Sequence, residues 1–80
     1  MYKAGQRFLL TRRNGDGDLI ESDYILAQVA ACKFALIDLN DGNRWYDPVE
    51  VEDSTNVSHE EMEVMRGCMP EGYVWKLKEN

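Results

Sequence analysis

Acidic and aromatic side chains adjoin each other in the middle of this chain, and together they could bind a protein. Trp45 and Tyr46 come directly before residues 47–63, which hold seven acids and no Lys or Arg. Aromatic rings bury large areas on contact, and carboxylates attract a partner with a basic surface. The residues that we predict to bind a protein are Trp45, Tyr46, Glu60, Glu61, Glu63 and Tyr73.

Arginines offer a different chemistry, the binding of a small ligand that carries phosphate. Arg12, Arg13 and Arg44 could hold phosphate groups, while Trp45 or Tyr46 stacks on a base. A nucleotide-like ligand is therefore the alternative to a protein partner. The two hypotheses differ in whether binding depends on the arginines or on the acids.

The segment NGDGD, residues 14–18, is similar to part of a calcium-binding loop. A loop that starts at Asn14 has Leu19 where glycine must turn the chain. A loop that starts at Arg12 has a cation at the first ligand position. We therefore predict a hairpin turn at this segment and no metal site.

Residues typical of catalysis or metal binding are scarce. His59 is the single histidine, and Glu63 lies one helical turn from it, but no further ligand is indicated. The chain has no phosphate-binding glycine loop, nucleophile elbow or CxxC pair. We expect a protein that is not an enzyme and has no catalytic residue, metal or cofactor. A hydrolytic enzyme that uses the acids is a third hypothesis.

Size and charge limit the class of protein and its partners. Eighty residues predict a single domain, 1–80. The net charge of -6 opposes binding to phosphate backbones and anionic membranes, so nucleic acid is an unlikely partner. A homo-oligomer is compatible with the sequence.

The expected location is the cytoplasm. No stretch approaches the roughly 18 continuous apolar residues of a membrane span, and the first apolar run is too short for a secretory signal. Cys32 and Cys68 are therefore expected to stay reduced and buried. Neither is expected to bind a metal.

Most of the chain has the pattern of short strands separated by turns. Pro48 interrupts the pattern, so the run after it is expected to be a sheet edge or an irregular extension. The tight turn at residues 40–43 contains an Asp-Gly pair, which favours a hairpin. The predicted strands are residues 6–13, 24–31, 34–39, 44–46, 49–51 and 72–78.

One short helix is predicted at residues 59–66. Ser58 and Glu61 have the spacing of a capping box, with Val57 and Met62 as the flanking hydrophobic pair. Gly67 is a favourable C-terminal cap, and a proline follows shortly after it. Three methionines at helical spacing are expected to seal one end of a barrel, with a flexible recognition groove as the alternative: Met62, Met65 and Met69.

This order of elements resembles the SH3-like small β-barrel. The resemblance rests on residues 5–13, YILAQVAACKFALIDL, DGNRWYDPVEV and the closing YVWKL. It implies a mainly β fold, a barrel of about five strands with one short helix before the last. Small acidic barrels of this kind also resemble phage and prophage proteins. No PxxP-groove motif is present, so no peptide-binding residues follow from the resemblance.

Overall fold

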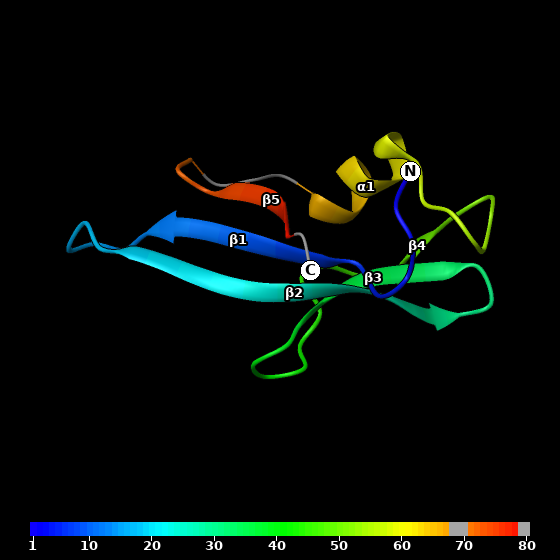
Figure 1. The fold of residues 1–80 in the computed structure, drawn as a ribbon, viewed down its shortest axis with the longest axis horizontal. Helices are drawn as coiled ribbons and strands as arrows, with labels where there is room; N and C mark the ends of the chain where they lie inside the picture. The colour runs from blue at the N-terminus through cyan, green and yellow to red at the C-terminus, as the bar shows by residue number, and fades with distance from the viewer. Residues whose placement is uncertain (68–70, 79–80) are drawn as a thin grey trace.

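The computed structural model describes residues 1–67 and 71–78, which form one antiparallel β-sheet with a short helix packed on it (Figure 1). The sheet order is β4-β3-β2-β1-β5, and β4 and β5 are its two edges. The elements are β1 Arg7–Arg13, β2 Leu19–Ala30, β3 Lys33–Asp38, β4 Val49–Glu50, α1 His59–Arg66 and β5 Val74–Lys78. The prediction of a mainly β fold with five strands and one short helix is confirmed. Within the described residues the sheet is open.

β1 and β2 form the long hairpin that projects from one end of the molecule (Figure 1). The predicted turn is confirmed: the side-chain oxygen of Asn14 accepts hydrogen bonds from the backbone N–H groups of Asp16 and Asp18 at 2.9 and 3.0 Å. The predicted start of the second strand at residue 24 is wrong, because β2 begins at Leu19. Pairing with β1 down to Arg13 draws residues 19–23 into the sheet.

The turn after β3 forms as predicted, but the strand expected at residues 44–46 does not. The N–H of Asp38 donates to the carbonyl of Asn43 at 2.8 Å, and Gly42 has a φ of 78°. Arg44 makes one isolated bridge to β3, after which the chain bends. The bend turns Trp45 toward the core, whereas Tyr46 stays half-exposed. β4, after Pro48, pairs with the other end of β3 as the predicted sheet edge.

α1 has the predicted bounds and the predicted capping box. The N–H of Glu61 donates to Ser58 Oγ at 3.1 Å, and the N–H of Ser58 donates to the Glu61 carboxylate at 2.9 Å. At the other end, Gly67 has a φ of 65° and its N–H donates to the carbonyl of Glu63 at 3.1 Å. The predicted stop at Pro70 lies outside the described residues.

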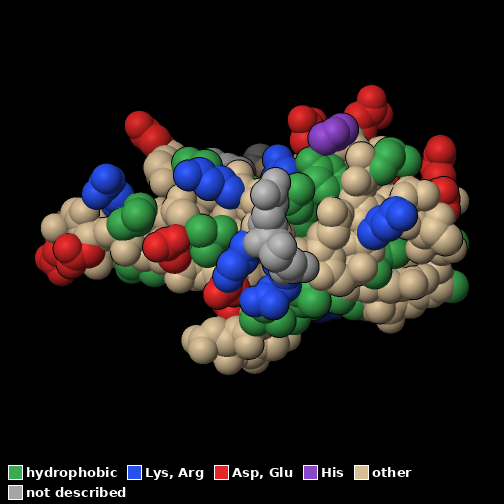
Figure 2. Space-filling view, viewed as in Figure 1, with side chains coloured by type: hydrophobic (Ala, Val, Ile, Leu, Met, Phe, Trp, Pro, Cys, Tyr) green, Lys and Arg blue, Asp and Glu red, His purple; other side chains and the backbone are tan. Residues whose placement is uncertain are grey.

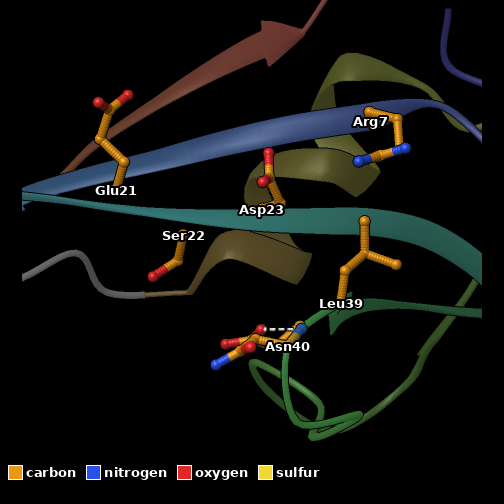
Figure 3. A pocket seen from close by; sticks show the side chains of 7 residues that line it. Arg7, Glu21, Ser22, Asp23, Leu39 and Asn40 are labelled. Carbon is orange, nitrogen blue, oxygen red and sulfur yellow. Dashed lines mark hydrogen bonds between the residues drawn. The ribbon is translucent and has the colours of Figure 1, made fainter.

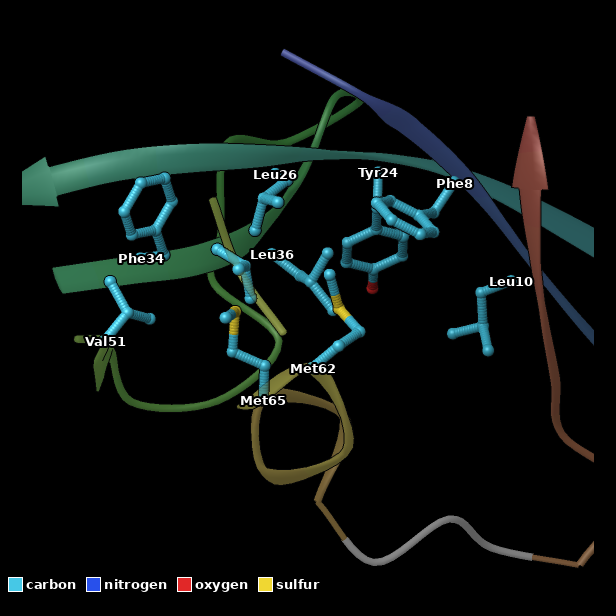
Figure 4. Close-up of a cluster of buried hydrophobic side chains, with 10 residues drawn as sticks. Phe8, Leu10, Tyr24, Leu26, Phe34, Leu36, Val51, Met62 and Met65 are labelled. Atoms are coloured by element: carbon cyan, nitrogen blue, oxygen red, sulfur yellow. The ribbon is translucent and has the colours of Figure 1, made fainter. Parts of the chain in front are cut away.

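The core lies between α1 and one face of the sheet, which we call the inner face (Figure 4). Met62 and Met65 are fully buried there, and Val57 is buried beside them. Burying each such side chain contributes about 1.5–3 kcal/mol to folding. The sheet contributes Phe8, Leu10, Tyr24, Leu26, Phe34 and Leu36. Met69, the third predicted methionine, lies outside the described residues.

Cys32 is exposed and free, so its predicted burial is wrong. It lies in the exposed turn between β2 and β3. Cys68 lies outside the described residues.

Substituting Ser58 with alanine removes the side-chain acceptor that caps α1. We expect Ser58→Ala to lower the free energy of unfolding by about 1 kcal/mol. Ser54→Ala is the matched control, because Ser54 is exposed and precedes the helix; a surface change of this kind costs under about 0.5 kcal/mol. Urea unfolding measures both. Equal midpoints for the two variants would contradict a stabilising role of the capping box.

Candidate functional site

Beyond the part of the inner face that α1 covers, three aromatic rings pack against one another. The rings of Tyr24 and Trp75 have centroids 4.9 Å apart, and those of Trp45 and Trp75 are 5.4 Å apart, both edge to face. Tyr24 and Trp45 are 5.9 Å apart in the same arrangement. Such pairs contribute about 0.5–1.5 kcal/mol beyond the area that they bury. Trp45 and Trp75 are therefore partly buried at the rim of the core.

Two tyrosines extend this group of rings toward solvent. Tyr46 lies 5.6 Å from Trp45 between ring centroids, and its side chain is 46% exposed. Tyr73 lies 6.2 Å from Trp45, and the guanidinium of Arg12 lies 5.9 Å from the Tyr73 ring centroid, within cation–π range. We call Tyr24, Trp45, Tyr46, Tyr73 and Trp75 the aromatic cluster.

The C-terminal end of α1 fixes the position of the aromatic cluster. The indole N–H of Trp45 donates to the carbonyl of Arg66 at 2.7 Å. A Cβ atom placed on Gly67 would lie 2.3 Å from the Tyr46 ring, so glycine is needed for the ring to lie against the helix end. Three of the six predicted protein-binding residues, Trp45, Tyr46 and Tyr73, are therefore in one group.

The three predicted acids lie on α1 but differ in what they contact. Glu61 closes the capping box, and its carboxylate also accepts the N–H of Glu52 at 3.0 Å. The N–H groups of Ser58 and Glu52 lower the pKa of Glu61 below its ordinary 4.5. Its stabilising effect is therefore present above that pH and is lost as the pH falls through the lowered value. Glu60 and Glu63 are exposed.

The three arginines of the alternative hypothesis do not come together. Arg12 and Arg13 are consecutive in β1, so they point to opposite faces of the sheet. Arg13 donates to the carbonyl of Gly17 at 2.9 Å in the hairpin turn. Arg44 lies 3.9 Å from Asp47 in an exposed ion pair. Of the three, only Arg12 contacts the aromatic cluster in the described part of the chain.

A shallow pocket lies on another side of the sheet, between β2 and the turn after β3 (Figure 3). Arg7, Asp23 and Asn40 are among the residues that line it, and Leu39 is the one apolar side chain in that lining. Lys78 Nζ donates to Asp23 at 2.8 Å and lowers the pKa of that carboxyl. The lining is mostly polar, and the carboxylate of Asp23 is already paired with Lys78. The pocket is therefore a weaker candidate for a binding site than the aromatic cluster.

His59 has a structural contact. Its Nδ1 lies 3.0 Å from the hydroxyl of Tyr2, and the two rings meet edge to face at 5.0 Å. The described residues contain no group of three or more His, Cys, Asp or Glu side chains that could hold a metal. No helix among these residues is long and apolar enough to cross a membrane.

Sequence reasoning missed Tyr24 and Trp75 as members of the aromatic cluster, and Arg66 and Gly67 as the residues that position it. Tyr24 could have been found from the strand register, because it is opposite Phe8 on the inner face. The Arg66 contact is made by a backbone carbonyl, which no side-chain pattern reports. No family model, curated protein or solved structure matches this chain, so its function must be inferred from the geometry of the site.

Substituting Gly67 with alanine tests how Tyr46 is held. We expect both Gly67→Ala and the control Gly42→Ala to lose about 1 kcal/mol of stability, because each places alanine at a positive φ. Only Gly67 has a ring within contact distance of the added methyl group. The NMR signal of the Trp45 indole N–H should therefore shift in Gly67→Ala alone. The same signal in both variants would contradict this contact.

Proposed function

We propose that this chain is a non-enzymatic binding module that engages a protein partner through the aromatic cluster and the exposed side of α1. The observation that supports it most is Tyr46, a ring that is half-exposed yet packed against Trp45 and Gly67. A ring already held in one position loses little conformational freedom on binding. Tyrosine and tryptophan are also enriched among the residues that dominate binding energy.

The exposed side of α1 supplies apolar area and charge next to that ring. Val64 is 63% exposed, and Glu60 lies one helical turn before it on the same side. Glu63 lies one turn before Gly67, the residue that Tyr46 packs against. The proposed surface therefore runs from Glu60 to Tyr46, and its acids favour a partner with a basic surface.

Glu61 has a different role in this proposal. Its carboxylate is engaged by two backbone N–H groups, so it stabilises α1 and the chain before it. A variant at this position would change folding together with binding. The acids that act on the partner are Glu60 and Glu63.

One observation favours the small-ligand alternative. Arg12 lies over Tyr73, so a cation and an aromatic face adjoin, as phosphate and base recognition would require. The other two arginines of that hypothesis have contacts elsewhere. A ligand would therefore depend on Arg12 alone, which is why we prefer the protein partner.

The proposal also covers the fold family, the origin and the location of the protein. The return of β5 to pair with β1, at the far side from β3, supports an SH3-like plan. The small size and acidity support a phage-type protein that works in the cytoplasm. Nucleic acid and membranes are not the proposed partners, and self-association is compatible with the proposal.

The test compares variants of the immobilised protein for capture of partners from a host-cell lysate. Tyr46→Ala should speed dissociation of a genuine partner about thirtyfold, because losing a central aromatic costs about 2 kcal/mol. Replacing Glu60 and Glu63 together by Gln should instead slow association and flatten its dependence on salt.

Leu19→Ala with Glu21→Gln is the matched control, since both residues are exposed on the hairpin away from α1. It should leave both rates unchanged. A partner whose binding ignores Tyr46 and the two acids but is lost in Arg12→Ala would refute the proposal. That result would support the small-ligand alternative.

A further inference from the structure

β5 is an edge strand with one described neighbour. It pairs with β1 from Thr11↔Val74 to Arg7↔Lys78. In the described part of the chain its backbone lies beside no other strand or helix, although the Trp75 side chain packs against Tyr24 of β2. Four of its five residues are exposed. The free backbone N–H and C=O groups of such a strand can pair with an added strand.

The side chains of β5 alternate between apolar and basic. Trp75 and Leu77 are opposite Leu10 and Phe8, so they belong to the inner face. Leu77 is nonetheless 49% exposed, because it lies beyond the reach of α1. Lys76 and its neighbour Lys78 point to the other face of the sheet, which we call the outer face.

The outer face is basic along β1 and β5 although the protein is acidic as a whole. Arg7 is opposite Lys78, and the buried Nε of Arg7 has no hydrogen-bond partner among the described residues. Figure 2 shows several Lys and Arg side chains over this part of the molecule with some acids among them, and further acids near the histidine. Asp23 pairs with Lys78, which leaves Lys76 as the lysine of β5 without a described ion pair.

The lysines of β5 favour an acidic segment over a second copy of β5 as the strand that pairs with this edge. If a second copy of β5 paired with the first, the lysines of the two copies would lie opposite or beside each other on the outer face. Like charges so placed are destabilising. An acidic segment would instead form cross-strand pairs of opposite charge with the same lysines.

We propose that the free edge of β5 receives an extended acidic segment of a partner protein as an added strand. Its acidic side chains face Lys76 and Lys78, and its alternate apolar side chains lie beside Trp75 and Leu77. The backbone hydrogen bonds supply affinity and the alternation supplies specificity. No residue of β5 lies near α1 in the described residues, so this surface does not include Tyr46 or the acids of α1, although it shares Trp75 with the aromatic cluster.

The test uses two synthetic peptides, one of alternating Glu and Val and one of alternating Lys and Val. NMR spectra of the labelled protein should show that the Glu peptide shifts the amide signals of β5, whereas the Lys peptide does not. Lys76→Glu should weaken binding of the Glu peptide by about tenfold or more, because it sets like charges side by side. The matched control is Lys33→Glu, an exposed lysine on β3.

A second form of the Glu peptide, methylated at alternate backbone nitrogens on its pairing edge, separates strand addition from simple charge attraction. It keeps the charge but cannot donate the ladder hydrogen bonds, so its binding should be lost. Equal binding of the methylated and unmethylated peptides would overturn the proposal, as would equal binding of the Glu and Lys peptides. Tyr46→Ala should leave peptide binding unchanged, which keeps this test independent of the proposed function.

Discussion

The helix is too short to cover the sheet, and the rest of the structure follows from that mismatch. Eight residues of α1 span about 12 Å, whereas the twelve residues of β2 span about 40 Å, close to the 41 Å long axis of the molecule. Met62 and Met65 can therefore cover only part of the inner face (Figure 4). Aromatic side chains cover the next part of the inner face, because their rings are large enough to shield it from solvent without a helix above it. Tyr24 is buried, but Tyr46 remains half-exposed, and an exposed ring can bind a partner.

Each end of α1 contacts a segment that precedes it in the sequence. At its start, the Glu61 carboxylate holds the backbone of Ser58 and Glu52. At its end, the Arg66 carbonyl accepts the Trp45 indole N–H and Gly67 leaves space for Tyr46. One short helix thus completes the core and positions the aromatic cluster. A substitution that weakens the capping box of α1 should therefore also loosen the packing of the aromatic cluster.

The helix could be predicted from sequence because its signals are local. Ser58 and Glu61 are three residues apart, and Gly67 marks the end of the same short stretch. The start of β2 could not be predicted from local signals, because residues 19–23 form a strand only by pairing with β1. The strand expected at 44–46 failed for a related reason, since burial of the Trp45 side chain overrides the pairing tendency of aromatic residues.

The candidate site was found in part. Trp45 and Tyr46 were identified as neighbours in sequence, and Tyr73 as an aromatic in the predicted last strand. The packing of Trp45 on Tyr73, Tyr24 and Trp75, however, depends on the tertiary fold and on strand register. The separation of Arg12 from Arg13 follows from strand alternation and could have been predicted. The bond between the Glu61 carboxylate and the Ser58 backbone could be predicted from their spacing. The bonds that the Glu52 N–H donates to Glu61 and that the Trp45 indole donates to the Arg66 carbonyl leave no signature in the sequence.

The central claim is that the end of α1 holds the aromatic cluster in place before any partner binds. Hydrogen exchange of the Trp45 indole N–H, followed by NMR in the free protein and assigned with Trp45→Phe, tests it most directly. The account predicts exchange much slower than that of a solvent-exposed indole, because the proton is shared with the Arg66 carbonyl at 2.7 Å. Exchange at the rate of an exposed indole would show that the cluster is not held by the helix and would contradict the account.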